Sequence, residues 1–283
     1  MLLRAFAKIN LGLRILGKRD DGFHELRTVF QTIDWCDEIS LCPSRRFRFV
    51  TSDGPSGEDN LVVRAVRAFE QVTGRTAKVE IHLDKKIPTG AGLGGGSADA
   101  AVTFLGLQKL FEINISMESA QSVLSALGSD VPFFTLGGRA LGTGRGNQIE
   151  TLADESDYWL VMVQPGFSIA TAEGYSWLTL SDKTNTIGGF RSEFVSGSEH
   201  VEWVNDFEAP VFGRHPLLAE IRNELSSIGA FRAALSGSGS VVFGQFRDEA
   251  KAAEAASTLR RRFDVKVVRP LTRAEYVSRI VEE

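Results

Sequence analysis

Five glycines fall within seven positions and lead directly into an alanine-rich segment: Gly90, Gly92, Gly94, Gly95 and Gly96, then Ser97. Glycine lets backbone N–H groups approach a ligand closely, because no Cβ stands in the way. A helix that begins directly after the glycines adds unpaired N–H donors and a partial positive charge. Together these features predict an anion site, for which a phosphate chain is the usual occupant. A purely structural glycine turn is the simpler alternative.

The glycine spacing fits two common phosphate-binding motifs, but each match is incomplete. Gly90, Gly92 and Gly95 fit the dinucleotide fingerprint, with Glu112 near the expected acidic position. That fingerprint should directly follow a strand, which it does not do here. The segment also resembles a P-loop in which Gly96 replaces the lysine. A cation for the phosphates must then come from another part of the fold.

Two further groups are candidates for chemistry. Lys8 and Asn10 alternate with apolar residues, so one face of a strand presents a cation beside an amide. Asp130 precedes Pro132 at the start of a short helix, where its carboxylate either caps the helix or faces a ligand as a base. From spacing alone, the two interpretations of Asp130 are equally good, whereas a surface lysine is the better interpretation of Lys8.

Composition bounds the class of protein. The 283 residues are 43% apolar and 24% charged with a formal net charge of −4, which is ordinary for a soluble globular protein. The length predicts two domains. No basic tract indicates a nucleic-acid partner, and no apolar run approaches the ~18 residues of a membrane helix. With no secretory signal and only Cys36 and Cys42, we expect a cytoplasmic protein without disulfides or a Cys/His metal site.

Periodicity and capping residues predict the elements of the first half. The first strand should be half-buried, since its apolar residues alternate with polar ones. One helix is bracketed by Asn60 and Gly74, and another begins at the glycines with Ser97 as its cap. The predicted strands are 1–15, 26–33, 38–41, 47–51 and 79–83. The predicted helices are 61–73, 97–111, 117–127 with Ser116 as its cap, and a short one that begins at 129. A hairpin spans 139–151 around Gly144-Arg145-Gly146.

The second half has a β-α-β-β-α-β pattern, which predicts a sheet with helices packed on one face. We place the domain boundary so that one domain covers 1–153 and the other 154–283. The predicted strands are 159–163, 231–235, 241–246 and 265–268; the helices are 171–180, 216–226 and 248–262; a long polar loop spans 181–197.

Three ordered motifs resemble those of the GHMP kinases, the family of galactokinase, homoserine kinase and mevalonate kinase. They are Ala7–Leu11, Pro88–Ala98 and Leu235–Phe243. The resemblance implies an α+β, two-domain fold with an N-terminal ribosomal-S5-domain-2-like domain and a C-terminal ferredoxin-like domain. It also implies an ATP-dependent kinase that uses Mg²⁺.

The resemblance assigns roles to particular residues. Lys8 and Asp130 match the catalytic positions, where Asp130 is the base and Lys8 keeps it ionised. Asn60 and Lys85 line the adenine pocket, and the Ser97 hydroxyl reaches the metal. The ATP-binding loop consists of Pro88, Thr89, Gly90, Ala91, Gly92, Leu93, Gly94, Gly95, Gly96, Ser97 and Ala98.

Three further segments resemble the family members that phosphorylate a cytidine diphosphate-linked polyol in non-mevalonate isoprenoid precursor biosynthesis: Lys8–Leu13, Arg19–Leu26 and Gly128–Phe134. Aromatic rings and an imidazole suit a cytosine. Those members usually carry Tyr at the position of Phe23, so a hydroxyl is missing here. The implied substrate-binding residues are Asn10, Phe23, His24, Tyr175, Gly237 and Ser238.

Other functions remain open at this point. A kinase with another acceptor (homoserine, mevalonate or a sugar) would not be inhibited by CDP. A non-catalytic nucleotide-binding protein would bind ATP without releasing ADP, and a dehydrogenase would bind a nicotinamide cofactor. We expect a monomer or weak homodimer, and we assign no role to His82, His200 or His215.

Overall fold

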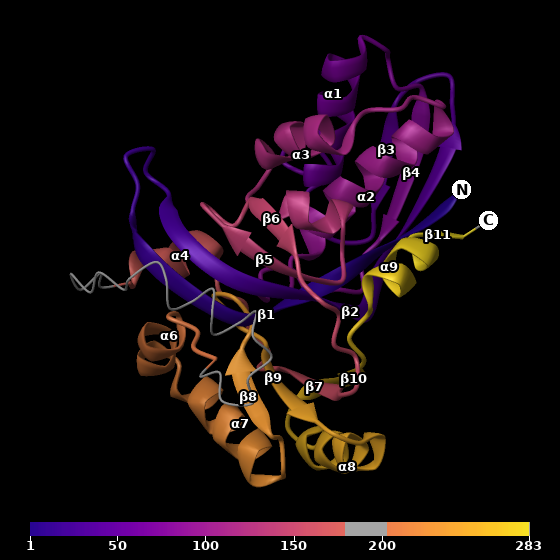
Figure 1. The fold of residues 1–283 in the computed structure, drawn as a ribbon. Coiled ribbons are helices and arrows are strands. Elements are labelled where there is room, and N and C mark those ends of the chain that lie inside the picture. Colours follow the sequence, from indigo (N-terminus) through magenta and orange to yellow (C-terminus); the bar gives the residue numbers. More distant parts are fainter. Residues whose placement is uncertain (179–202, 283) are drawn as a thin grey trace.

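Two β-sheets form the framework of the computed structural model, which describes residues 1–178 and 203–282 (Figure 1). In the larger sheet the path β11-β1-β2-β4-β3 is extended by β5 on β2 and β6 on β5; the smaller sheet has the order β10-β7-β9-β8. The strands of the larger sheet are β1 (Leu2–Lys18), β2 (His24–Pro43), β3 (Arg48–Thr51), β4 (Val79–Asp84), β5 (Arg139–Thr143), β6 (Gln148–Thr151) and β11 (Val281–Glu282). The predicted loop over 181–197 and His200 lie outside the described residues.

β1 and β2 pair along almost their whole length as one antiparallel hairpin. The prediction of two separate strands, over 26–33 and 38–41, is therefore wrong. Cys36 and Asp37 fall in the predicted gap, but they pair with Phe6 and Ala5 of β1 and carry the strand across it. The continuous strand matters for the site, because Asp37 accepts the backbone N–H groups of Lys86 and Ile87, which lead into the glycine-rich segment.

The prediction that β1 is half-buried is also wrong. Its polar residues Lys8 and Asn10 are each only 3% exposed. The register with β2 shifts between Phe6 and Lys8, and the Lys8 N–H donates to the Leu93 carbonyl at 2.9 Å. The glycine-rich segment thus covers the face of the strand that the alternating pattern assigned to solvent.

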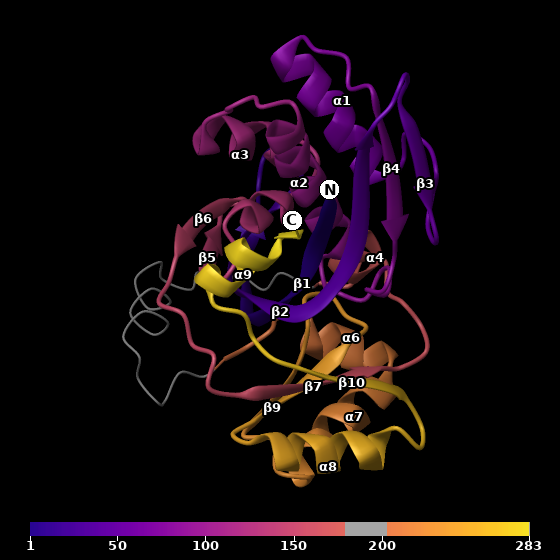
Figure 2. The same cartoon turned by 90° about the vertical axis from the view of Figure 1, so that its right-hand side faces the viewer.

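Helices of the first half pack on one side of the larger sheet (Figures 1 and 2). Their bounds are α1 (Leu61–Thr73), α2 (Gly95–Leu110), α3 (Met117–Ser125) and the 3₁₀ helix η1 (Val131–Thr135). The predicted caps of α1 are confirmed: Asn60 accepts a hydrogen bond from the Val62 N–H, and Gly74 ends the helix in a left-handed conformation. Buried phenylalanines, among them Phe69 and Phe104, fill the core between these helices and the sheet.

The second half confirms the predicted α+β pattern. Strands β7 and β9 lie in the centre of the smaller sheet, flanked by β10 and β8, and every pairing is antiparallel. Helices α7 and α8 cover one face (Figure 1). The bounds are β7 (Trp159–Gln164), α4 (Thr171–Ser176), α6 (Glu208–Arg214), α7 (Pro216–Ser227), β8 (Arg232–Leu235), β9 (Val242–Phe246), α8 (Glu249–Leu259) and β10 (Asp264–Val268).

The chain then returns to the larger sheet through α9 (Arg273–Arg279), and β11 pairs with β1. Our sequence analysis did not predict α6 or α9. The buried Tyr276 of α9 donates from its hydroxyl to the Phe134 carbonyl at 2.5 Å, so α9 braces η1 directly after Asp130. The domain boundary at 153 stays a prediction. In the described ranges we find no helix with the length and apolarity needed to cross a membrane.

Gly137→Ala tests this brace. Gly137 has φ +63°, and a Cβ there would lie 2.1 Å from a Tyr276 ring atom. We expect the free energy of unfolding to fall by about 2–4 kcal/mol, from backbone strain plus overpacking. Gly74→Ala is the matched control, since Gly74 has φ +65° and nothing within 4 Å; strain alone should cost about 1 kcal/mol. Urea unfolding measures both, and equal losses would contradict the brace.

Candidate active site

A pocket of about 800 Å³ is lined by residues from both halves of the chain. The glycine-rich segment and the loop before α1 form one end. Phe23, His24 and Tyr175 form the other end, and Lys8 and Asp130 lie among the remaining lining residues. Nearly all sequence-predicted site residues thus come together in one cavity; Ala98 is buried in the core behind it.

The glycine-rich segment adopts backbone conformations that side chains disfavour. Gly90, Gly92 and Gly94 all have positive φ, and Gly94 is the N-cap of α2 with φ +68°. The prediction that Ser97 caps this helix is wrong: α2 begins at Gly95, so Ser97 is its third residue. Gly94 has no side chain to bond the first turn. The N–H groups of the first turn of α2 are therefore left for an anion, and the positive end of the helix dipole lies beside them.

A loop of the second half closes on this segment. The Ser236 hydroxyl donates to the Gly92 carbonyl at 2.9 Å, and a Cβ on Gly92 would lie 2.0 Å from the Ser236 carbonyl oxygen. Only glycine allows this approach. Gly237 and Ser238, which follow in the same loop, line the pocket, and Ser238 packs against Gly174 of α4.

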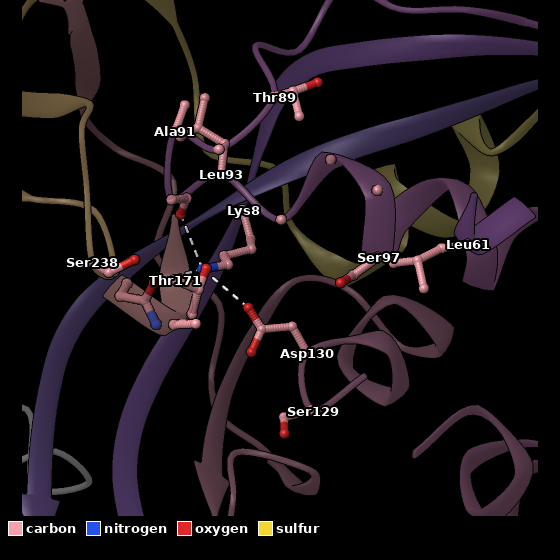
Figure 3. A pocket seen from close by; sticks show the side chains of 18 of the residues that line it. Lys8, Leu61, Thr89, Ala91, Leu93, Ser97, Ser129, Asp130, Thr171 and Ser238 are labelled. Atoms are coloured by element: carbon pink, nitrogen blue, oxygen red, sulfur yellow. Dashed lines mark hydrogen bonds and ion pairs between the residues drawn. The ribbon is translucent and has the colours of Figure 1, made fainter. Parts of the chain in front are cut away.

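Lys8 and Asp130 form an ion pair at the centre of the pocket. The Lys8 Nζ lies 3.2 Å from Asp130 Oδ2, and it donates to Asn10 Oδ1 at 2.6 Å and to the Gly92 carbonyl at 3.0 Å (Figure 3). Asn10 is itself held, because its amide donates to the Thr28 hydroxyl at 2.7 Å. The ammonium is therefore fixed between the glycine-rich segment and the carboxylate.

Asp130 keeps its carboxylate available. It occupies the N-cap position of η1, but its side chain makes no capping hydrogen bond, and it is 34% exposed to the pocket. Lys8, in contrast, is 4% exposed. This geometry suits a base that must reach a bound hydroxyl beside a buried cation.

Rings gather at the other end of the pocket. His24 and Tyr175 stack with centroids 4.8 Å apart and planes 22° from parallel, and Phe207 meets Tyr175 edge-on. Burial, with a smaller contribution from Lys18, holds the pKa of His24 below its ordinary 6.5. The imidazole is therefore neutral at pH 7, able both to stack and to hydrogen-bond the edge of a base.

Asn60 and Lys85 line the pocket, but both have local partners. The Asn60 amide caps α1 and donates to the Pro55 carbonyl. The Lys85 Nζ lies 2.5 Å from Asp37 Oδ2 and 2.8 Å from Asp99 Oδ2. Burial alone lowers the pKa of Lys85, but the two carboxylates outweigh it and hold that pKa above 10.5. Burial raises the pKa of Asp99 to about 8.

Arg145 is a pocket residue that the sequence analysis missed. It lies in the turn between β5 and β6, and its guanidinium stacks 4.3 Å from the Phe23 ring centroid. Within 1–178 and 203–282, it has no carboxylate at ion-pair distance, although its charge helps to lower the pKa of Asp21. The neighbouring Gly144 and Gly146 predicted the turn but not which surface the arginine would meet.

The chain is similar to known kinases over nearly its whole length. Residues 60–138 match the family described as "GHMP kinases N terminal domain", and residues 197–265 match "GHMP kinases C terminal". A 4-diphosphocytidyl-2-C-methyl-D-erythritol kinase from Solibacter usitatus is 46% identical over 256 residues, which cover 87% of this chain and 81% of that protein.

Solved structures agree. The crystal structure of a 4-(cytidine 5'-diphospho)-2C-methyl-D-erythritol kinase superposes with a TM-score of 0.82 at 33% identity, covering 95% of this chain and 99% of that one. A homoserine kinase from Cytophaga hutchinsonii superposes with a TM-score of 0.70 at 17% identity, covering 96% and 94%. The second likeness concerns the fold alone.

Proposed function

This chain belongs to the GHMP kinase family, and we propose that it transfers the γ-phosphoryl group of ATP to the 2-hydroxyl of 4-diphosphocytidyl-2-C-methyl-D-erythritol, a step of isoprenoid precursor biosynthesis. The observation that carries the proposal is the Lys8–Asp130 ion pair. It lies in one pocket with an amide-rich glycine segment at one end and stacked rings at the other.

The donor end takes the triphosphate. The N–H groups of the glycine-rich segment and of the first turn of α2 bind its oxygens, and the helix dipole favours the negative charge. Lys8 supplies the cation that this segment lacks, since its Nζ lies 3.0 Å from the Gly92 carbonyl. It stabilises the charge that develops on the transferring group.

The transfer then needs one proton acceptor. The acceptor hydroxyl oxygen bonds to the γ-phosphorus, the bond from that phosphorus to the bridging oxygen breaks, and ADP leaves with its electron pair. The hydroxyl proton passes to Asp130, whose carboxylate lies 3.2 Å from the Lys8 ammonium. Positioning and charge thus supply the catalysis, without a covalent intermediate.

The site suits a magnesium ion that is bound mainly by the oxygens of the triphosphate. The described residues hold no group of three or more His, Cys, Asp or Glu side chains that could bind a metal by themselves. Mg²⁺ prefers phosphate oxygens, water and only one or two protein ligands. The Ser97 hydroxyl, which lines the pocket at the start of α2, would be the protein ligand. The ion would neutralise charge on the phosphates.

The acceptor end suits a cytidine diphosphate group. A base stacks among the rings of Phe23, His24 and Tyr175, and neutral His24 hydrogen-bonds its edge. The diphosphate between base and polyol needs a cation, and Arg145 presents its guanidinium beside Phe23. Homoserine and mevalonate carry neither a base nor a diphosphate, so these residues favour the cytidine-bearing acceptor.

ADP release tests the proposed function directly. We expect ATP turnover with 4-diphosphocytidyl-2-C-methyl-D-erythritol and none above background with homoserine, mevalonate or galactose. CDP should inhibit competitively with the acceptor. Turnover with another of these acceptors alone would reassign the substrate. ATP binding without ADP release with any of them would indicate a non-catalytic nucleotide-binding protein.

Arg145→Met should raise KM for the acceptor about tenfold, because a charge-assisted hydrogen bond to phosphate is lost. KM for ATP should stay within twofold. Arg247→Met is the matched control: Arg247 also stacks 4.3 Å from a half-exposed phenylalanine, Phe231, but away from the pocket. Steady-state kinetics with each substrate varied separately measures both. Equal effects of the two substitutions would show that Arg145 does not bind the acceptor.

A further inference from the structure

A buried cluster of three titratable side chains lies behind the glycine-rich segment. Lys85 bridges Asp37 of β2 and Asp99 of α2, at 2.5 and 2.8 Å. Asp37 is fully buried and Asp99 is 2% exposed. The mechanism proposed above uses none of these side chains at the reacting atoms.

Stability alone is a weak reason for such a cluster. It buries two aspartates against one lysine, and among the described residues Asp99 Oδ1 has no hydrogen-bond partner. Removing charges from water costs several kcal/mol per ion, and apolar residues of similar volume often serve as well or better. A defined geometry is what a buried ionic cluster can supply in place of stability.

The Asp37 carboxylate holds the backbone that enters the glycine-rich segment. Its Oδ1 accepts the Lys86 N–H at 2.5 Å and the Ile87 N–H at 2.7 Å. Trp35, two residues earlier on the same strand, donates from its indole to the Lys86 carbonyl at 2.9 Å. Residues 85–87 are therefore tied to β2 on both sides of one peptide unit.

This held segment sets the position of the first residue of α2. A Cβ on Gly95 would lie 2.9 Å from Ile87 Cγ2 and 3.2 Å from Lys85 Nζ. Gly95 thus packs directly on residues 85–87, and a shift of that segment would move the first N–H groups of the helix. Displacements of about 1 Å in a reacting complex can cost ~10²-fold in rate.

We infer that Asp37 is a positioning residue of the nucleotide site: through residues 85–87 it holds the first turn of α2 in register with the triphosphate. The inference rests on the proposed function. Asp37 itself touches neither substrate. Its loss should therefore weaken nucleotide binding and leave the acceptor site, at the far end of the pocket, unaffected.

The test compares three variants of the full chain. Asp37→Ala should raise KM for ATP and the Kd for ADP about tenfold, with KM for the acceptor within twofold. Asp37→Asn keeps an oxygen for the backbone N–H groups but turns an NH₂ toward Lys85, so about threefold is expected. Asp99→Asn alters a carboxyl of the same cluster but removes no hydrogen bond to the backbone of residues 85–87, and should give a smaller rise, within twofold.

The readouts separate a positioning role from a structural one. Calorimetric titration with ADP reports the nucleotide site without turnover, and thermal unfolding reports stability. Equal increases in both KM values, or equal effects of Asp37→Asn and Asp99→Asn, would overturn the inference. If Asp37→Ala does not fold, the Asn pair decides alone. A wild-type chain that neither binds ADP nor consumes ATP would instead refute the proposed function.

Discussion

Asp130→Asn should lower kcat by about 10²–10⁴-fold, because an amide cannot take the proton of the acceptor hydroxyl. Asparagine has the shape of aspartate and still offers an oxygen to the Lys8 ammonium, which lies 3.2 Å away. Neither KM should change more than about threefold, since the lost interaction is made in the transition state. Steady-state ADP release measures kcat and both KM values.

Two controls make this result specific. The fold should survive, because the Asp130 side chain caps no helix; thermal unfolding checks this. Asp59→Asn removes the same charge from the pocket wall, away from the ion pair, and should stay within about threefold of wild type in kcat. An Asp130→Asn enzyme of near wild-type kcat would show that Asp130 is not the base.

Lys8→Met should lower kcat by about 10²–10³-fold, the usual loss when a charge-stabilising group is removed from a dry site. Methionine is of similar length and fills the buried space, but it donates nothing to Asn10, Gly92 or Asp130. The melting temperature should fall as well, because buried acceptors lose their donor.

The double variant Lys8→Met, Asp130→Asn tests whether the two residues act together in catalysis or independently. Residues that act together lose activity in a strongly non-additive way. We therefore expect the double variant to be about as slow as the slower single variant. Losses that multiply would mean that Lys8 acts on the phosphate independently of Asp130.

Local features of the fold were predictable because they depend on neighbours in sequence. The cap at Asn60, the glycine end at Gly74 and the Ser116 cap of α3 are all confirmed. These signals act within one helical turn. The start of α2 was missed for a related reason: preference for a serine cap favoured Ser97, whereas Gly94 begins the helix through a left-handed backbone.

Pairing across the sheet was not predictable in the same way. The sequence predicted separate strands over 26–33 and 38–41, yet β2 continues through the gap because β1 supplies hydrogen bonds along it. The turn at Arg145 was predicted, but its position beside Phe23 depends on the register of β5 on β2, in which Gly142 faces Thr28. Register is set by burial and by the partner strand.

The sequence alone determined the caps of α1 and α3, the glycine-rich segment and, through resemblance, the candidate pair Lys8 and Asp130. Only the tertiary structure decided that this pair lies 3.2 Å apart, that Lys85 is held by two carboxylates, and that Ser236 closes on Gly92. The physical reason is the separation along the chain of the residues that make each contact. Caps and turns arise from contacts within a few residues, whereas distances between side chains far apart in the chain depend on how sheets and loops bury one another.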